Sequence, residues 1–361
     1  MNTTSLNAWH HAHSARMVDF AGWEMPVQYT SIVEEHNAVR NAVGLFDISH
    51  MGRLQFFGNT VESFLNGVLT IDSSKLKVGD VRYSLVCQSD AGILDDVLLY
   101  RFADRWELVV NASNRDKILD WLKHCAGYAS FNLIDRTQET TMIAVQGPKA
   151  LALMNQVIGL ALDGMKYYSV QDASFCGTTG VISRTGYTGE DGFELVVASA
   201  EGERIWDLLM DAGQAYGVVP AGLGCRDTLR LEAAMPLYGH ELNEGIDPLT
   251  AGLDFAVKFN KPEYTGKAAL EQIREAGVIQ RRVGLVLEGR RIAREETPVM
   301  IDGVEAGRVT SGTFSPTLQK TIAMAYVPCS HSAVGTKLFV SLRGTMIPAE
   351  VVALPFYRRA K

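Results

Sequence analysis

AGILDDVLLY, residues 91–100, is an apolar run that predicts a β-strand, and it contains two adjacent carboxylates, Asp95 and Asp96. The segment 89–92 that leads into it, Ser-Asp-Ala-Gly, predicts a turn. Aspartate is rare in strands and costly to bury without a partner, and neighbouring side chains of a strand point to opposite faces. Two interpretations follow. Either one carboxylate accepts backbone N–H groups and the other is exposed, or one faces a pocket and handles a proton or a cationic nitrogen.

The chain on either side of this strand mixes helix and strand patterns up to about residue 260. Residues 54–57 and 106–110 are typical of strands. Residues 31–34, Ser-Ile-Val-Glu, have the capping-box pattern of a helix start, and the apolar spacing that follows predicts a helix that stops at Gly44.

The pattern changes after about residue 275, where short alternating runs are separated by turn residues. These runs are residues 283–287, 308–310, 322–327 and 337–342. Close spacing of short strands is typical of a small sandwich or barrel. The sequence therefore predicts an α+β fold with a β-rich C-terminal domain.

The composition is that of a globular protein with a mildly acidic surface. The chain has 361 residues, 47% hydrophobic and 21% charged, and a net charge of −7. This charge argues against nucleic acid as the main partner and against a polybasic membrane anchor. The five cysteines are widely spaced, which favours reduced thiols, and the N-terminus lacks a signal-peptide pattern. We expect a cytoplasmic protein.

Several common catalytic motifs are missing from the sequence. It has no phosphate-binding Gly-x-x-x-x-Gly-Lys-Ser/Thr loop, no Gly-x-Gly-x-x-Gly, no Gly-x-Ser-x-Gly elbow and no His-Glu-x-x-His. His10, His11 and His13 cluster at a predicted helix end, where solvated histidines are more common than metal ligands. With no evident protein nucleophile, an enzyme of this sequence would rely on a nucleophile carried by a bound cofactor or substrate.

A glycine-rich loop precedes a second strand that holds a carboxylate. Residues 186–194 read GYTGEDGFE, and Glu194 lies on the opposite strand face from the apolar Phe193. One interpretation is an acidic, solvated hairpin loop. The other is that Tyr187 and Glu194 converge on the edge of an amide-like or pterin-like ligand, with Glu194 accepting paired N–H bonds.

Residues 221–232 predict a helix in which Arg226 and Arg230 lie one turn apart. Like charges at this spacing destabilise a helix unless anions lie nearby. The partners are internal, such as Asp227 with Arg230, or include an anionic ligand that the rigid guanidinium fork recognises.

Taken together, these segments resemble the aminomethyltransferase family, the T-proteins of the glycine cleavage system. The matching stretches run in order over nearly the whole chain: MVDFAGWEMPVQY (17–29), GLFDISHMG (44–52), GILDDVLLYR (92–101), LVVNASNRDK (108–117), AVQGPKAL (144–151), SRTGYTGEDGFEL (183–195), AGLGCRDTLRLEAAMPLYGHEL (221–242) and VTSGTFSPTL (309–318). Eight colinear blocks are far more specific than a single motif.

The resemblance implies three domains in a ring around a central folate pocket. The first would be a discontinuous α+β domain of residues 1–50 and 137–260, and the second an α+β domain of residues 51–136. The third would be a small β-barrel or jelly roll of residues 275–361.

The resemblance also implies a reaction and its partners. The lipoylated H-protein would present an S-aminomethyl-dihydrolipoyl group, whose methylene is transferred to tetrahydrofolate as cosubstrate, without a metal. The products would be 5,10-methylenetetrahydrofolate, ammonia and dihydrolipoyl H-protein. N5 of tetrahydrofolate would then be the missing nucleophile, and the protein would act by positioning and electrostatics. A monomer that docks its carrier transiently is expected.

The family's functional positions carry over to named residues of this sequence. Asp96 would lie beside the reacting edge of folate as the catalytic carboxylate, and Asp95 would be structural. Glu194 would bind the amino-pyrimidine edge of the pterin. The positions expected to contact folate are Met51, Tyr83, Asp96, Asn111, Tyr187, Glu194, Arg226 and Arg294.

Two rival classes share this scaffold. One is another folate-linked one-carbon transferase, such as a demethylase, which would be expected to diverge at the Asp96 strand or the Glu194 loop. The other is a folate-binding iron–sulfur-assembly protein, marked by a Lys-Gly-Cys-Tyr-x-Gly-Gln/Glu stretch whose chemistry depends on its thiol. Residues 261–267 here read KPEYTGK and contain no cysteine, which favours the transferase.

Overall fold

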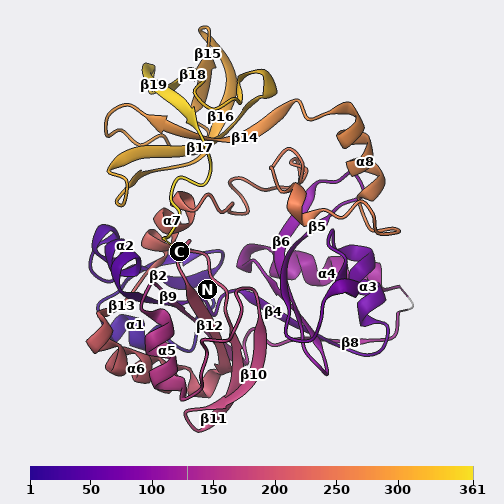
Figure 1. The fold of residues 1–361 in the computed structure, drawn as a ribbon, viewed down its shortest axis with the longest axis vertical. Helices are drawn as coiled ribbons and strands as arrows, with labels where there is room; N and C mark the ends of the chain where they lie inside the picture. The colour runs from indigo at the N-terminus through magenta and orange to yellow at the C-terminus, as the bar shows by residue number, and fades with distance from the viewer. Residues whose placement is uncertain (128, 361) are drawn as a thin grey trace. The chain divides into compact units, whose positions relative to one another are not determined.

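The computed structural model describes residues 1–127 and 129–360, and its contacts divide the chain into two compact units. The first unit comprises residues 1–66, 72–84 and 97–226. The second comprises residues 67–71, 85–96 and 227–361. Figure 1 follows the chain from the N-terminus in indigo to the C-terminus in yellow.

A six-stranded sheet forms the core of the first unit, in the order β10-β11-β12-β9-β3-β13. Its strands are β3 (Val43–Asp47), β9 (Thr140–Gln146), β10 (Val170–Phe175), β11 (Thr178–Ser183), β12 (Gly192–Ala198) and β13 (Val218–Pro220). The middle strands β9 and β12 pair antiparallel, with Glu194 opposite Ala144.

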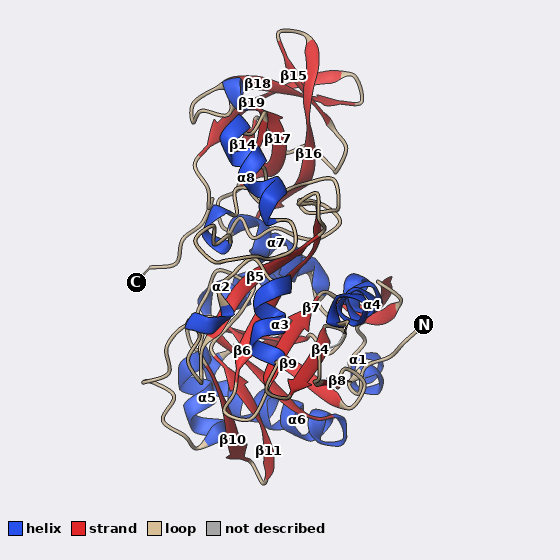
Figure 2. Cartoon of the chain, turned by 90° about the vertical axis from the view of Figure 1, so that its right-hand side faces the viewer, coloured by secondary structure: helices blue, strands red, loops and turns tan. Residues whose placement is uncertain are grey.

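Helices pack on this sheet because its strands present one apolar face. On that face lie α1 (Asn7–Ala12), α5 (Ala150–Ile158) and α6 (Gly202–Gly213), whereas α2 (Ile32–Asn41) packs against the other face of β3. Phe193 and Leu195 of β12 join Leu153 of α5 and Trp206 of α6 in one buried cluster. Figure 2 shows α5 and α6 as blue helices beside the red strands β10 and β11. Burying side chains of this size is the main stabilisation of the unit.

A five-stranded sheet follows the order β5-β6-β7-β4-β8. Its strands are β4 (Gly52–Phe57), β5 (Val81–Cys87), β6 (Ile93–Arg101), β7 (Trp106–Val110) and β8 (Asn132–Asp135). The other elements of this half of the chain are β1 (Arg16–Phe20), β2 (Trp23–Gln28), α3 (Val61–Val68), α4 (Arg115–Ala126) and four short 3₁₀ turns (Ser73–Lys75, Ala112–Asn114, Ser199–Glu201 and Gln214–Tyr216). The predicted strand around Asp95 and Asp96 is β6.

The helix predicted after Ser31 is present, but its predicted end was wrong. The Ser31 hydroxyl accepts the N–H of Glu34 at 3.2 Å, as the capping pattern predicts. The helix ends at Asn41, and Gly44 lies inside β3. A Cβ on Gly44 would lie 2.4 Å from a methyl of Val39, so this glycine allows the helix to pack against the strand that follows it.

The second unit is built around a closed barrel in the order β14-β17-β16-β15-β18-β19. Its strands are β14 (Gln280–Leu287), β15 (Pro298–Ile301), β16 (Val304–Ser315), β17 (Lys320–Pro328), β18 (Lys337–Leu342) and β19 (Thr345–Val352). Alternate residues such as Val283, Leu285 and Leu287 point into its buried core. The predicted β-rich C-terminal domain is therefore confirmed as a barrel, and the α+β class with it.

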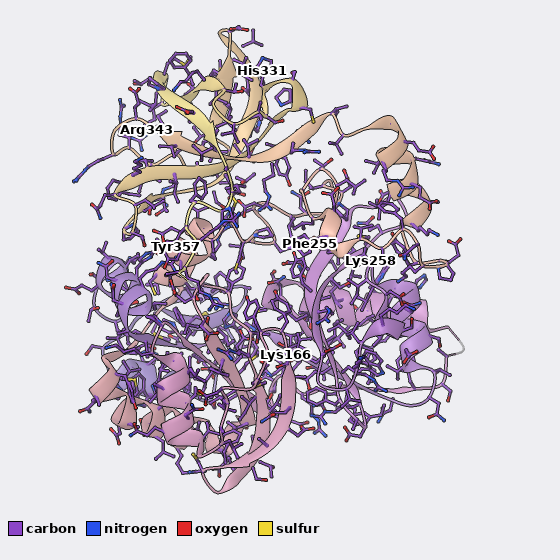
Figure 3. All side chains as sticks on the ribbon, viewed as in Figure 1. Lys166, Phe255, Lys258, His331, Arg343 and Tyr357 are labelled. Atoms are coloured by element: carbon purple, nitrogen blue, oxygen red, sulfur yellow. The ribbon has the colours of Figure 1, made fainter. Side chains whose placement is uncertain are left out.

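Helices and tight turns complete the second unit. They include α8 (Lys267–Ala276), the 3₁₀ turns Asp254–Ala256 and Cys329–His331, and most of α7 (Leu223–Glu232), which begins in the first unit. Arg343, labelled in Figure 3, lies in the turn between β18 and β19 at φ 51°. Among the described residues, no helix is both long and apolar enough to cross a membrane. The boundaries of the three expected domains stay a prediction.

Candidate functional site

The loop that joins β11 to β12 is clamped to the first unit rather than solvated. Arg40 of α2 donates to the backbone oxygen of Thr188 at 2.7 Å and to Glu190 at 2.8 Å. The side chains of Arg40 and Glu190 are each only 4% exposed. Arg184 forms a second, two-pronged pair with Asp191. The acidic residues of this loop therefore hold its shape, and the interpretation as a solvated hairpin was wrong.

The buried side-chain amide of Gln146, at the end of β9, also fixes this loop. The Nε2 group of Gln146 donates to the backbone oxygen of Thr185 at 3.0 Å, and its Oε1 atom accepts the Thr188 hydroxyl at 2.9 Å. A Cβ on Gly186 would lie 2.0 Å from that Oε1 atom, and one on Gly192 would lie 2.4 Å from Nε2. Only glycine at these two positions leaves room for the amide.

Glu194, which follows this loop in β12, is a buried carboxylate with few hydrogen-bond partners. It lies on the face of β12 opposite the apolar cluster, and its Oε2 atom accepts a hydrogen bond from the Thr185 hydroxyl. Within the described residues its Oε1 atom accepts no hydrogen bond. Burial raises the pKa of Glu194, although the Thr185 bond and the positive charge of Arg226 act in the opposite direction.

Arg226, in the first turn of α7, lies near Tyr187 and Glu194. Its guanidinium carbon is 4.9 Å from the centre of the Tyr187 ring, a cation–π geometry. Burial lowers the pKa of Arg226, and the charge of Glu194 opposes that shift. One guanidinium nitrogen, Nη1, is enclosed without a hydrogen-bond partner in the described part of the chain. The predicted residues Tyr187, Glu194 and Arg226 are thus brought together, with hydrogen-bonding capacity left unused.

Met51 and Asn111 lie at matching ends of two paired strands. The register of β4 and β7 pairs Gly52 with Val110, so Met51 and Asn111 are the next residues beyond that pair. The oxygen of Met51 accepts a bond from Arg53. Both side chains are half-buried, as is that of Tyr83 in β5.

Asp95 and Asp96 separate as the alternation of a strand requires, and both belong to the second unit. Asp95 is 0% exposed, whereas Asp96 is half-buried. Arg294 of the same unit is exposed, and its backbone oxygen accepts bonds from Thr297 in a turn before β15. The roles carried over to Asp96 and Arg294 stay predictions.

The second arginine of α7 has internal partners, as one sequence interpretation proposed. Arg230 donates to Asp227 at 2.8 Å and to the buried Glu241 at 2.7 Å. It also donates to the hydroxyl of Ser311 at 2.8 Å. The charges of Arg230 are therefore used within the second unit, and Arg230 does not need an anionic ligand.

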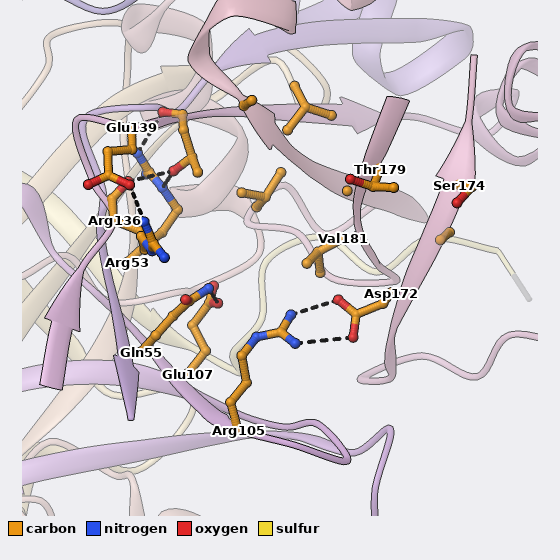
Figure 4. Close-up of a pocket in the computed structure, with 16 residues that line it drawn as sticks. Arg53, Gln55, Arg105, Glu107, Arg136, Glu139, Asp172, Ser174, Thr179 and Val181 are labelled. Carbon is orange, nitrogen blue, oxygen red and sulfur yellow. Dashed lines mark hydrogen bonds and ion pairs between the residues drawn. The ribbon is translucent and has the colours of Figure 1, made fainter. Parts of the chain in front are cut away.

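A separate pocket of about 570 Å³ opens in the first unit between β4 and β7 on one side and β10, β11 and β12 on the other. Figure 4 shows its charged lining residues paired with one another: Arg105 bonds Asp172, at 2.6 Å for the shorter contact, and Arg136 bonds Glu139. Gln55 donates to the buried Glu107 at 2.9 Å. The sequence did not predict this pocket, since its walls come from strands far apart in the chain.

Comparison with known proteins gives the fold and the site a family. The GCVT N-terminal domain matches residues 6–261, and the glycine cleavage T-protein C-terminal barrel domain matches residues 280–358. The aminomethyltransferase of Symbiobacterium thermophilum is 46% identical over 99% of this chain and 98% of its own. That of Geobacillus sp. is 43% identical over 100% of both. The crystal structure of glycine cleavage system aminomethyltransferase T from Bartonella henselae superposes with a TM-score of 0.93 at 34% identity, covering 100% of this chain and 99% of the other.

The two domain matches together with the curated aminomethyltransferase relatives define a folate-dependent transferase of one-carbon units. The chain belongs to the glycine cleavage T-protein family. It is a tetrahydrofolate-dependent aminomethyltransferase of the glycine cleavage system.

Two residues near the site were not selected from the sequence. Arg40 and Gln146 shape the loop that carries Glu194. Gln146 gave a signal, because it is a polar residue at the end of the apolar strand run 142–145. Arg40 gave none, because its partner Glu190 is 150 residues away in the chain.

Proposed function

We propose that Tyr187, Glu194 and Arg226 hold the pterin of tetrahydrofolate for methylene transfer from the lipoylated H-protein. The observation that carries this proposal is the unused hydrogen-bonding capacity of two buried ions, Glu194 and Arg226. A carboxylate with a free oxygen suits paired N–H donors such as those of an amino-pyrimidine edge. The Tyr187 ring adds an aromatic surface against which a flat heterocycle can pack.

The reaction exchanges two bonds at one carbon. The methylene loses its bonds to the amine nitrogen and to the lipoyl sulfur, and it gains bonds to N5 and N10 of tetrahydrofolate. The two N–H protons of tetrahydrofolate end on ammonia and on the released thiol, so atoms and charge balance. The chemistry needs no protein nucleophile; the protein holds the reacting groups in place and stabilises charge.

We assign Asp96 the role of orienting tetrahydrofolate and stabilising positive charge as ammonia leaves. Its half-buried position, opposite the fully buried Asp95, supports a carboxylate that reaches a ligand. Met51, Tyr83, Asn111 and Arg294 complete the proposed folate contacts. A cytoplasmic monomer that binds its carrier transiently is the form we propose for the active protein.

The segment that would distinguish the iron–sulfur-assembly rival has a structural task here. Lys261 is buried, and its ammonium group donates to the backbone oxygens of Leu69 and Ile71 at 2.6 and 2.7 Å. The ammonium group also lies 4.5 Å from the centre of the Tyr264 ring. This segment ties the second unit together and carries no thiol, which supports the transferase.

Turnover with defined components tests the proposal. The full chain is supplied with tetrahydrofolate and aminomethyl-loaded H-protein, and ammonia and methylenetetrahydrofolate are followed together. The proposal requires both products and their dependence on each component. Binding of tetrahydrofolate without either product would mean that the donor is wrong, and absence of binding would remove the site assignment as well.

Asp96→Asn is the decisive variant for the catalytic assignment. It keeps the size of the side chain and removes its charge, so we expect near-normal folding and a fall in turnover of about 100-fold or more. Asp95→Asn is the matched control: at a fully buried position it should change stability more than turnover of the folded enzyme. Unchanged turnover in Asp96→Asn would remove Asp96 from the mechanism.

A further inference from the structure

Two buried hydroxyl groups, those of Ser183 and Thr185, lead to the carboxylate of Glu194. The Thr185 hydroxyl donates to Oε2 of Glu194, and the Ser183 hydroxyl lies 2.7 Å from that of Thr185. All three residues are buried. A hydroxyl has one proton to donate, and Thr185 gives its proton to Glu194, so Ser183 is the donor to Thr185. This hydroxyl chain therefore runs in one direction, from Ser183 through Thr185 to the carboxylate.

The six-stranded sheet holds both hydroxyls in place beside Glu194. Ser183, the last residue of β11, is paired directly with Glu194 of β12. Just beyond that strand, the backbone oxygen of Thr185 accepts the side-chain amide of Gln146 at 3.0 Å. The two donors are therefore fixed by the paired strands and by Gln146 before any ligand binds.

The hydroxyl chain leaves part of the carboxylate free. An ionised carboxylate offers about four acceptor positions, and Thr185 occupies one of them, on Oε2. Oε1 receives no hydrogen bond from the part of the chain that the structure describes, and it is not among the polar side-chain atoms that are enclosed there without a partner. Oε1 therefore remains accessible to a donor from outside the chain.

We infer that Thr185 is a positioning residue for tetrahydrofolate: with the support of Ser183, its hydroxyl holds the Glu194 carboxylate so that Oε1 accepts an N–H group of the pterin. This inference deepens the proposed function and rests on it, because the ligand at Glu194 is tetrahydrofolate. A glutamate side chain has several rotatable bonds, and fixing them in advance reduces the entropy lost on binding. Thr185 was absent from the residues expected on sequence grounds.

The same hydrogen bond favours the charged form of Glu194, the form that accepts N–H donors. Burial raises the pKa of Glu194, whereas the Thr185 bond and the positive charge of Arg226 lower it. The other ionisable group that interacts with this carboxylate is Tyr100 of β6, and burial raises the pKa of its hydroxyl well above the usual value, so Tyr100 stays neutral near pH 7. Loss of the Thr185 hydroxyl should therefore move the titration of Glu194 to higher pH.

Substitutions of the two hydroxyl residues test the inference. Thr185→Val keeps the shape of the side chain without the hydroxyl, Thr185→Ser keeps the hydroxyl, and Ser183→Ala removes the second donor. Thr310→Val is the matched control, because the Thr310 hydroxyl donates to another buried carboxylate, that of Glu241, at 2.6 Å in the second unit. For each full-length variant, the dissociation constant of tetrahydrofolate is measured by calorimetry from pH 4 to 8, the melting temperature is measured without ligand, and kcat and KM are measured with loaded H-protein.

We expect Thr185→Val to bind tetrahydrofolate about tenfold more weakly at pH 7, through the loss of one hydrogen bond to a charged group. The loss should appear in KM for tetrahydrofolate rather than in kcat, and the pH at which affinity rises should be higher than in the wild type. Thr185→Ser should match the wild type in both respects, and Ser183→Ala should fall between the two. Thr310→Val should lower the melting temperature and leave both the affinity and its pH profile unchanged.

A double variant shows whether Thr185 acts through Glu194. Added to Glu194→Gln, Thr185→Val should lower the affinity by much less than it does in the wild-type background, because the charge that the hydroxyl supports is already gone. An equal loss in both backgrounds would overturn the inference.

Three further results would overturn it. They are wild-type affinity and pH profile in Thr185→Val, failure of Thr185→Ser to restore them, and a lower melting temperature as the only change. If Thr185→Val does not fold, Ser183→Ala decides: weaker binding with a shift to higher pH supports the positioning role, and wild-type binding overturns it. Failure of the wild-type chain to bind tetrahydrofolate would reject the proposed function itself, which is a separate result.

Discussion

Two buried glutamates, Glu241 and Glu194, each feel the charge of an arginine of α7, but only Glu241 is hydrogen-bonded to its arginine. In the second unit, Arg230 bonds Asp227, Glu241 and Ser311. Glu241 also accepts the Leu237 N–H at 3.0 Å and the hydroxyl of Thr310 at 2.6 Å. The hydrogen-bonding groups of Arg230 and Glu241 are thus satisfied by partners within the protein.

The pair in the first unit is not saturated. Glu194 accepts one bond, from Thr185, and Arg226 has an enclosed nitrogen without a partner among the described residues. The pKa values follow this difference. Burial acts to raise both carboxyl pKa values, but the charge of Arg230 and several donors hold the pKa of Glu241 below its usual value, whereas that of Glu194 is raised. Glu241 is therefore satisfied by donors of its own unit, whereas Glu194 keeps capacity for a further donor.

Removing the saturated arginine should have the largest effect on stability. Arg230→Met leaves Glu241 buried without its counter-ion, which costs about 3–5 kcal/mol of the free energy of unfolding. Thermal and chemical denaturation measure this loss. Affinity for tetrahydrofolate, measured on the folded fraction, should stay close to wild type.

A double variant tests whether the cost comes from the stranded charge. Arg230→Met combined with Glu241→Leu should recover part of the stability, because the buried carboxylate is gone as well. A single variant as stable as the wild type would contradict the view that this pair is structural.

The sequence predicts local features of these pairs better than distant ones. The bond between Asp227 and Arg230 was one of the expected alternatives, because the two residues lie three apart on a helix. The barrel was predicted because its alternating strands have period two and lie close together in the chain. Gly44 misled the helix assignment, because a glycine that allows close packing in a strand looks like a helix stop.

The unsaturated site is harder to predict from sequence alone. The local pattern offered a ligand-binding role for Tyr187, Glu194 and Arg226 only as one of two interpretations, and their assignment to folate came from the resemblance. The clamp formed by Arg40, Gln146 and Glu190 joins segments that meet only when the six-stranded sheet is assembled. The unpartnered Nη1 atom of Arg226 is recognised only when the packing around it is known, since a sequence shows which groups are polar but not which are left without partners.

Neutralising the unsaturated carboxylate should act on binding and not on folding. Glu194→Gln replaces a charged acceptor with a neutral amide, and we expect affinity for tetrahydrofolate to fall about 100-fold, the value of a charge-assisted hydrogen-bond pair of roughly 2–3 kcal/mol. The melting temperature without ligand should not fall, because burial disfavours the carboxylate charge. Calorimetry and thermal denaturation provide the two measurements.

Glu107→Gln is the matched control for that variant. Glu107 is also a buried carboxylate with a raised pKa and a single neutral donor, Gln55, but it lines the separate pocket of the first unit. Its substitution should leave tetrahydrofolate affinity unchanged. Equal losses in both variants would show that affinity responds to any buried carboxylate and not to Glu194 in particular.

Displacing the loop that Arg40, Gln146 and Glu190 hold should lower both stability and tetrahydrofolate affinity, each by less than the variants above. Gly186→Ala places a methyl 2.0 Å from the Gln146 side chain, so the loop must shift, at a cost of about 1–3 kcal/mol in stability. Because that loop positions Tyr187 and leads to Glu194, we expect affinity for tetrahydrofolate to fall about tenfold, or roughly 1.4 kcal/mol.

Shortening the side chain of Gln146 tests whether its clash with the new methyl causes the loss of affinity. Gly186→Ala combined with Gln146→Ser should recover part of the affinity, since the clash is removed. Gly67→Ala serves as a control, because nothing lies within 4 Å of the new methyl on α3. Equal affinity in Gly186→Ala and Gly67→Ala would disprove a positioning role for the clamp.

The smallest effect we expect is a pH dependence of opposite sign in the two pairs. The pKa of Glu194 is raised by burial, so its contribution to stability is present below the unfolded pKa and is lost as pH rises through the folded pKa. The lowered pKa of Glu241 acts in reverse: its contribution is present above the unfolded pKa and is lost as pH falls through the folded pKa. Melting temperatures from pH 2 to 8 should therefore show Glu194→Gln gaining on the wild type as pH rises above the ordinary carboxyl pKa of 4.5, and Glu241→Gln losing to it as pH rises toward that value. Tetrahydrofolate affinity of the wild type should increase over the same rise, because binding needs the ionised Glu194, and it should be flat in Glu194→Gln. Parallel pH profiles for both variants would mean that the two carboxylates share one environment, against the distinction between a structural pair and a ligand-binding pair.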